Sequence, residues 1–316
     1  MRIVRLFCIL TFIGTGIACY SQSTDSNKAI DNQRPKIAFS FDDGSTMDMP
    51  GYKLEVWNEM LLNKLKQNQL KAVLFVAGSN LTGAKGSYIL NSWDRAGQKI
   101  ANHTYSHYNI NSNKISLPDF EKDVLLDDSL IRKYKNFYPY FRFPYLKEGN
   151  TEQVANSFRE FLLEHHYKTG HVTIDASDWY IDNRLVKRLQ ENPDAAISGF
   201  KNFYLEHLYD RALFYDSLST ALTNRKIAHV MLLHHKLVNA LFLDALIQKF
   251  KANGWEVIDA AEAYKDDIYK QVPTTIPAGE SLIWSLAKQT GKFEKVLRYP
   301  AEDSQYEKEK MDKLGL

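Results

Sequence analysis

The stretch that decides the fold is residues 36–44, which read KIAFSFDDG. Its apolar and aromatic residues favour a buried strand, yet this strand ends in two adjacent carboxylates, Asp42 and Asp43. Two aspartates before a glycine most often form a turn. Neighbouring side chains on a strand point to opposite faces, so both carboxylates reach one site only if the strand ends there, with Gly44 to turn the chain.

Short apolar segments alternate with helical patterns through most of the chain. The predicted strands are residues 37–41, 71–78, 98–102, 140–145, 170–175, 227–234 and 255–259. The predicted helices include residues 116–134, with Ser116 as the N-cap, and residues 150–166, with Asn150 as the N-cap. This alternation predicts an α/β fold with a parallel sheet and crossover helices.

The N-terminus has the layout of an export signal. Residues 1–18 combine two arginines with an apolar core and end in small residues, which predicts a signal peptide. The Gly-Ile-Ala-Cys sequence that follows resembles a bacterial lipoprotein processing site, although Gly16 stands where such sites usually carry leucine. We therefore expect Cys19 to be lipidated and residues 19–34 to form a flexible tether, with plain secretion as the alternative.

The charge and the cysteine content argue against a nucleic-acid-binding protein and against a disulfide-stabilised domain. The 40 basic and 38 acidic residues give a net charge of +2, which becomes 0 when Arg2 and Arg5 leave with the signal. No basic cluster indicates a nucleic-acid partner. The two cysteines, Cys8 and Cys19, leave none in the mature domain for an internal disulfide.

Two regions interrupt the alternation. Residues 192–225 are rich in Tyr and Leu and predict a helical insertion, and residues 271–316 form a C-terminal extension of unassigned role. The insertion carries an aromatic stripe that either walls a substrate groove or packs the helix onto the sheet. The residues of this stripe are Phe200, Phe203, Tyr204, Tyr209 and Tyr215.

Polar residues follow five of the predicted strands. In barrels of parallel strands the active site lies at the carboxyl ends of the strands, so these residues are expected to lie together. Each group is weak evidence alone; the spacing of His103 and His107, for example, suits a metal on a helical turn but occurs more often as a surface pair. The information lies in the order and placement of all five groups.

The motifs FSFDDG, HTYSH, RFPY, DASDW and LLH resemble, in this order, the five motifs of the polysaccharide deacetylase family, also called the NodB-homology domain or carbohydrate esterase family 4. The resemblance covers about residues 35–264, and we set the domain at 35–270. It implies a distorted (β/α) barrel of about seven parallel strands. It also implies a metal-dependent hydrolase that removes acetyl groups from N-acetylated sugars.

The resemblance assigns roles residue by residue. Asp43, His103 and His107 match the metal ligands, and Asp42 matches the catalytic base. Arg142 matches the arginine that holds this base. Asp178 matches a carboxylate that orients the arginine, and His234 matches the general acid, with His235 as its competitor. The residues expected to contact substrate are Tyr145, through its N–H on the oxyanion, Trp179 and Leu232.

The chemistry of these residue types agrees with the assignment. One carboxylate and two imidazoles form a three-ligand site with open positions, which favours Zn²⁺, although Co²⁺, Ni²⁺ or Mn²⁺ would fit. An O-acetyl carbohydrate esterase is the first alternative, since an alkoxide leaves more easily than an amine, and a non-catalytic glycan-binding envelope protein is the second. The sequence does not identify the glycan or the oligomeric state.

Overall fold

In a computed structural model of the chain, the predicted first strand is β1 (Lys36–Asp43), and it lies inside the sheet between β2 (Val73–Val76) and β7 (Ala228–His234). The structure describes residues 34–297 and 304–316. The predicted signal peptide, Cys19 and nearly all of the tether lie outside the described residues.

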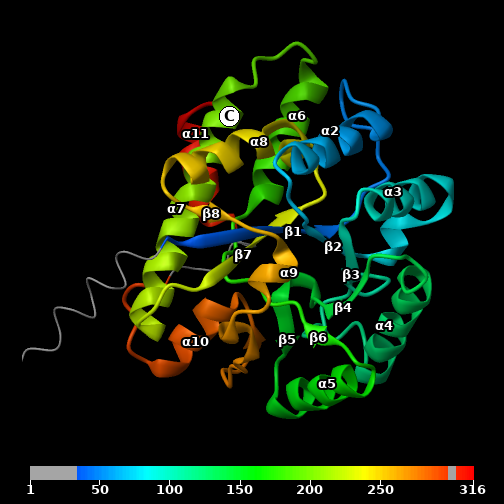
Figure 1. The fold of residues 1–316 in the computed structure, drawn as a ribbon, viewed down its shortest axis with the longest axis vertical. Coiled ribbons are helices and arrows are strands. Elements are labelled where there is room, and N and C mark those ends of the chain that lie inside the picture. Colours follow the sequence, from blue (N-terminus) through cyan, green and yellow to red (C-terminus); the bar gives the residue numbers. More distant parts are fainter. Residues whose placement is uncertain (1–33, 298–303) are drawn as a thin grey trace, which may run out of the picture. The chain divides into compact units, whose positions relative to one another are not determined.

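The sheet has seven strands in the order β6-β4-β3-β2-β1-β7, and β8 also pairs with β1 (Figure 1). Every pairing in it is parallel. The sheet curls into a half-barrel, so the predicted distorted (β/α) barrel is confirmed. The remaining strands of this sheet are β3 (Lys99–Asn102), β4 (Phe137–Phe141), β6 (Lys168–Thr169) and β8 (Glu256–Val257).

Helices connect and cover the strands, as the alternating pattern predicted. They are α2 (Leu54–Gln67), α3 (Gly83–Arg95), α4 (Leu117–Ile131), α5 (Glu152–Glu164), α6 (Asp178–Glu191), α7 (Ser198–Thr223), α8 (Leu237–Ala252), α9 (Ala260–Ala263), α10 (Leu282–Thr290) and α11 (Gln305–Lys313). The short 3₁₀ turns are η1 (Gly78–Leu81), η2 (Pro144–Leu146) and η3 (Asp267–Lys270). None of the helices in the described ranges is long and apolar enough to cross a membrane.

One of the two predicted helix N-caps, that of α4, is confirmed, and the other, that of α5, is wrong. Ser116 caps α4 by accepting a hydrogen bond from the Asp119 N–H, as predicted. The cap of α5 is Thr151 rather than Asn150, because the threonine hydroxyl accepts from the Val154 N–H. The helix therefore begins one residue later than the sequence suggested.

The strand predicted at residues 170–175 is wrong. The two residues of β6, just before this segment, pair with β4. Within the segment, the one residue with a β-bridge is Ile174, which pairs with Met231 of β7. The segment between them crosses from one edge of the sheet to the other, so it cannot keep a ladder with either edge. Its backbone instead makes isolated hydrogen bonds, such as that from the Thr173 N–H to the Val230 carbonyl.

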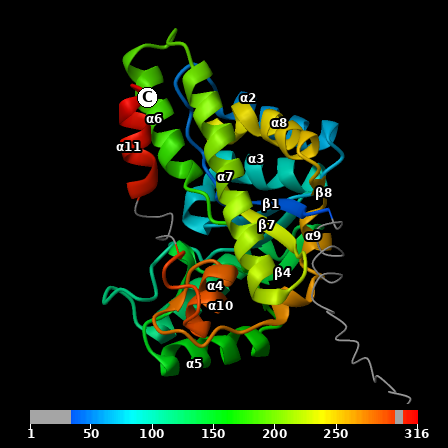
Figure 2. The ribbon, with the colours of Figure 1, turned by 90° about the vertical axis from the view of Figure 1, so that its left-hand side faces the viewer.

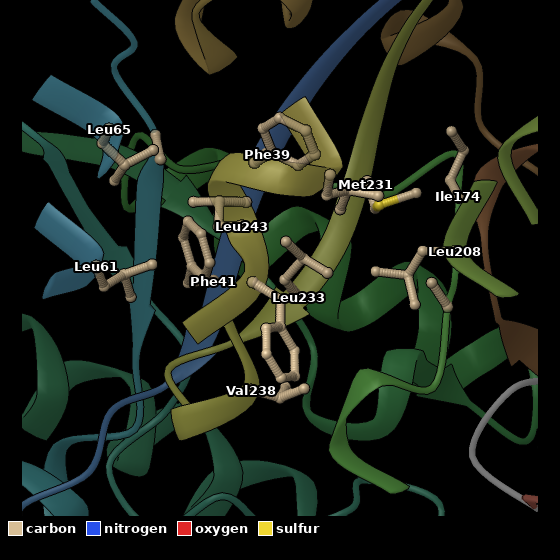
Figure 3. Close-up of a cluster of buried hydrophobic side chains, with 14 of the residues drawn as sticks. Phe39, Phe41, Leu61, Leu65, Ile174, Leu208, Met231, Leu233, Val238 and Leu243 are labelled. Carbon is tan, nitrogen blue, oxygen red and sulfur yellow. The ribbon is translucent and has the colours of Figure 1, made fainter. Parts of the chain in front are cut away.

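The side chains of β1 separate the two sides of the curled sheet. Phe39 and Phe41 point outward into the main core against Leu61 of α2 and Leu243 of α8 (Figure 3). The alternate residue Ala38 belongs to a separate cluster of small and aromatic side chains. The residues that carry chemistry therefore lie on the inner side, behind a core that fixes the strand's position.

The insertion is the long helix α7, which lies beside α8 (Figure 2). Four of its five predicted aromatics are buried, and Tyr209 packs against the same core. The stripe therefore packs the helix onto the domain, which is the second of the two predicted alternatives. The C-terminal extension supplies β9 (Ala278–Gly279), which pairs antiparallel with β5 (Lys147–Gly149), together with α10 and α11.

His235 belongs to a buried network that fixes the end of β7. Its Nδ1 accepts a hydrogen bond from the Ser45 N–H at 3.1 Å, so its Nε2–H donates to Asn58 Oδ1, also at 3.1 Å. Trp93 donates to the same Asn58 oxygen at 3.0 Å. Burial lowers the pKa of His235 to about 3, so the ring is neutral and structural.

This network predicts a pH-dependent stability. In the unfolded chain the His235 imidazole takes up a proton near its ordinary pKa of about 6.5, while the folded ring resists protonation down to about 3. Folding stability from this residue is therefore complete above pH 6.5 and falls as pH falls, by up to about 1.4 kcal/mol per unit. His235→Gln should reduce the slope of unfolding free energy between pH 7.5 and 5, measured by urea titration.

The matched control is His166→Gln, which replaces an exposed histidine after α5. This variant should keep the wild-type slope. An unchanged slope in His235→Gln would mean that the ring is not held neutral in the folded protein.

Candidate active site

The two aspartates at the end of β1 reach one site because the backbone turns at Asp43 and Gly44. Asp43 has φ 75° and Gly44 has φ 92°, both in the left-handed region. The strand's alternation is therefore broken at Asp43, and both carboxylates line the same cavity. A Cβ on Gly44 would lie 2.7 Å from Leu81 Cδ1. The turn therefore requires glycine both for its positive φ and for the close approach of Leu81.

His103 and His107 follow β3 on a loop, not on the helical turn that their spacing suggested. The loop is shaped by side chains: Asn102 Oδ1 accepts from the Thr104 N–H at 2.9 Å, and Thr104 Oγ1 accepts from the His107 N–H at 3.0 Å. Thr104 and His107 have positive φ. The two imidazole rings still come together, with centroids 4.9 Å apart.

Asp43, His103 and His107 fit a divalent cation. One ligand atom from each lies within 4.8 Å of the others. The buried Asp43 Oδ1 has no hydrogen-bond partner, and it lies 3.3 Å from His107 Nε2 and 3.8 Å from His103 Nε2. His103 Nδ1 lies 2.8 Å from the Arg142 carbonyl and donates its proton there, which leaves Nε2 free to bind a metal.

The protonation of these groups suits metal binding. Burial lowers the pKa of both His103 and His107, so their rings are neutral at neutral pH. Burial would raise the pKa of Asp43, but the positive charge of the His234 imidazolium lowers it, so this carboxylate is ionised. Neutral imidazole and ionised carboxylate are the forms that coordinate a cation.

Asp42 is held by a fully buried arginine. Arg142 Nη1 donates to Asp42 Oδ1, and the same guanidinium donates to the Gly170 carbonyl at 2.9 Å and to the Tyr264 hydroxyl at 3.0 Å. Its flat face lies 3.8 Å from the centre of the Phe75 ring. Burial raises the pKa of Asp42 to about 6, because Arg142 offsets only part of the desolvation.

The predicted contact of Asp178 with Arg142 is wrong. Asp178 is the first residue of α6, which begins beside the end of β7, and its carboxylate accepts from the His234 ring Nδ1–H at 2.7 Å and the His234 backbone N–H at 2.8 Å. The Tyr264 hydroxyl and the Gly170 carbonyl contact the arginine instead. Asp178 therefore orients the histidine.

This carboxylate sets the charge of His234. Burial would lower the pKa of the imidazole, but Asp178, Asp43 and Asp42 together raise it to about 9. With Nδ1 bonded to Asp178, the other ring nitrogen is available to the cavity that His234 lines.

Three supporting residues were missed by the sequence reading. Asn239 Nδ2 donates to Asp178 Oδ2 at 2.6 Å, and the Tyr204 hydroxyl donates to Asn239 Oδ1 at 2.7 Å. Tyr264 supports Arg142 from the segment after α9. No local signal marks them, because each acts through a contact between residues distant in sequence.

A cavity of about 300 Å³ brings most of the predicted residues together. Tyr145, Trp179 and Leu232 line it with the carboxylates and histidines, whereas Arg142 and Asp178 stand behind it. Tyr145 has φ 58°, and its ring packs 4.7 Å from that of His107. Four further lining residues had no predicted role: Leu146, Asp175, Asn183 and Lys236.

Comparison with known proteins agrees with this geometry. The family model described as polysaccharide deacetylase matches residues 29–161. Residues 29–161 of this chain are therefore similar to the polysaccharide deacetylase family. The matched region contains the aspartate pair, both loop histidines and Arg142, and it ends before Asp178 and His234.

One curated relative is the peptidoglycan-N-acetylglucosamine deacetylase of Bacillus cereus, which is 26% identical over 161 residues. The aligned part is 51% of this chain, and the chain spans only 50% of the length of that relative.

Two solved structures share the fold of this chain. The chitin deacetylase of Colletotrichum lindemuthianum has a TM-score of 0.50 and 20% identity over 73% of this chain and 88% of its own. A peptidoglycan N-acetylglucosamine deacetylase in complex with an N-hydroxybenzamide compound has a TM-score of 0.50 and 20% identity over 74% and 89%. At this identity the two structures show that the fold is shared.

The Asp178–His234 contact predicts a change that needs no substrate. Asp178→Asn removes the nearest negative charge, so the pKa of the His234 imidazole should fall from its raised value. The measurement is an NMR titration of the histidine ring carbons in chelator-treated protein. Asp194→Asn, which changes an exposed carboxylate after α6, should leave the His234 titration in place. An unshifted His234 in Asp178→Asn would contradict the assigned contact.

Proposed function

We propose that this chain is a metal-dependent carbohydrate N-deacetylase, which hydrolyses the acetamido group of an acetylated amino-sugar glycan. The observation that carries the proposal is the pairing of two groups in one cavity: Asp42, a carboxylate held by an arginine, and His234, an imidazolium held by a carboxylate. Beside them lie the three candidate metal ligands. The match of residues 29–161 to the polysaccharide deacetylase family model supports the same reaction class.

A divalent cation held by Asp43, His103 and His107 would supply Lewis-acid chemistry, lowering the pKa of a water and polarising the acetamide carbonyl. Asp42 is the base that takes the proton from the attacking water. Its pKa of about 6 leaves it ionised at neutral pH yet basic enough to accept a proton. The Tyr145 N–H donates to the oxygen that becomes negative.

His234 completes the reaction as the acid. Expulsion of an amine requires a proton on its nitrogen, and a pKa of about 9 keeps the imidazole protonated at neutral pH. After transfer, the bond to Asp178 holds the ring in the tautomer that has Nε2 free. Trp179 and Leu232 are the proposed walls for the sugar and the acetyl methyl group.

The substrate and location follow from the same proposal. Because a relative is named for peptidoglycan N-acetylglucosamine, we favour a glycan of the bacterial cell envelope. The export signal predicted at residues 1–18 agrees with that location, with the lipid on Cys19 as the predicted anchor. Zinc is the favoured cation from its imidazole and carboxylate ligands.

The experiment compares two leaving groups. Wild-type protein should release acetate from N-acetylglucosamine oligomers, and His234→Asn should lower kcat on these amides by roughly 10²- to 10⁴-fold. The same variant should lose less activity on O-acetylated xylan, because an alkoxide leaves with less help from an acid. His166→Gln, an exposed histidine, is the matched control and should keep full activity on both.

Other outcomes decide between the alternatives. Wild-type release of acetate from O-acetylated xylan alone would make the protein an esterase. Glycan binding without acetate release from either substrate would make it a binding protein of the envelope.

A further inference from the structure

Helix α11 of the C-terminal extension places a fully buried carboxylate, Glu307, against helix α7. Its Oε1 accepts a hydrogen bond from Arg211 Nη2 at 3.2 Å and lies 3.0 Å from His207 Nε2. Arg211 is also fully buried, and its guanidinium lies 5.0 Å from the centre of the Tyr306 ring. The pKa of Glu307 is lowered to about 2: burial opposes the shift, but the bond to His207 and the charge of Arg211 outweigh it.

The same oxygen reaches the residue that precedes Asp178. Ser177 Oγ donates to Glu307 Oε1 at 3.0 Å, and Ser177 is itself fully buried. It stands at the N-cap of α6, where a serine hydroxyl usually accepts a hydrogen bond from the helix, yet here the side chain makes no cap bond. Its φ of 41° is in the left-handed region, which a serine keeps only when its surroundings hold it there.

We propose that Glu307 is a positioning residue for the catalytic acid. Glu307 holds the Ser177 side chain in place. Ser177 in turn fixes the start of α6, so that the Asp178 side chain points toward His234. The proposal rests on the proposed function only for its activity readout. It gives the C-terminal extension a role: the extension completes the site from behind without contacting substrate.

The contacts of α11 with α6 provide a matched control. Figure 2 shows the two helices side by side, and Arg184 of α6 donates to Asp312 of α11 at 2.6 Å. Arg184 also donates to the Leu316 carbonyl, and Arg188 to the Gly315 carbonyl. Asp312→Asn therefore weakens the attachment of α11 to α6 without touching the route from Glu307 through Ser177 to Asp178.

The test uses Ser177→Ala and Glu307→Gln in the full chain, with kcat and KM measured for acetate release from N-acetylglucosamine oligomers. Both variants should lower kcat about 10-fold with KM unchanged, since the acid is misplaced while the cavity walls stay intact. Asp312→Asn should match wild type. Glu307→Gln also leaves Arg211 buried without its carboxylate and is expected to melt earlier, so Ser177→Ala, which keeps that ion pair, is the decisive variant.

If Glu307 acts through Ser177, the two substitutions combined should lower kcat no further than the more damaging of the two alone. Unchanged kcat in Ser177→Ala with an active wild type would overturn the inference and leave the proposed function standing. If the wild type releases no acetate from any glycan, the proposed function fails. Crystal structures then decide the inference: a lost Asp178–His234 hydrogen bond in Ser177→Ala supports it, and a retained one overturns it.

Discussion

Two neighbouring carboxylates at the end of a buried strand are the constraint on which the rest of the site depends. Two like charges about 4 Å apart repel by about 4 kcal/mol at the effective dielectric of a protein site, and burial adds to that cost. Asp42 and Asp43 can both be ionised only if each has its own positive partner. Arg142 is the positive partner of Asp42, and the His234 imidazolium is that of Asp43, whose buried Oδ1 has no hydrogen-bond partner.

Arg142 and His234, the positive partners, are themselves held by further contacts. Those contacts come from residues outside the five sequence motifs. Arg142 is satisfied by a backbone carbonyl and by Tyr264. The Asp178–His234 pair is held by Asn239 from α8, which is held by Tyr204 from the inserted helix. The extension adds β9 beside the strand that follows Tyr145. Tyr204 of the inserted helix thus helps to hold the Asp178–His234 pair of the candidate site through Asn239.

The sequence predicted the barrel and eight of the twelve residues that line its cavity, because these follow local patterns and motifs. Apolar runs marked the strands, and polar groups marked their ends. Three expectations were wrong where one element meets another. Residues 170–175 cross between sheet edges, the His103–His107 pair lies on a loop shaped by Asn102 and Thr104, and Asp178 faces His234 instead of Arg142. The domain limits that we set stay predictions.

The division of work between the adjacent aspartates is the central claim, and calorimetric titration of zinc into chelator-treated protein tests it most directly. Asp42→Asn keeps an oxygen toward Arg142 and should bind one zinc as the wild type does, while releasing no acetate. Asp43→Asn should lose tight zinc binding. Loss of zinc in Asp42→Asn, or zinc binding at wild-type affinity in Asp43→Asn, would contradict the assignment of ligand and base.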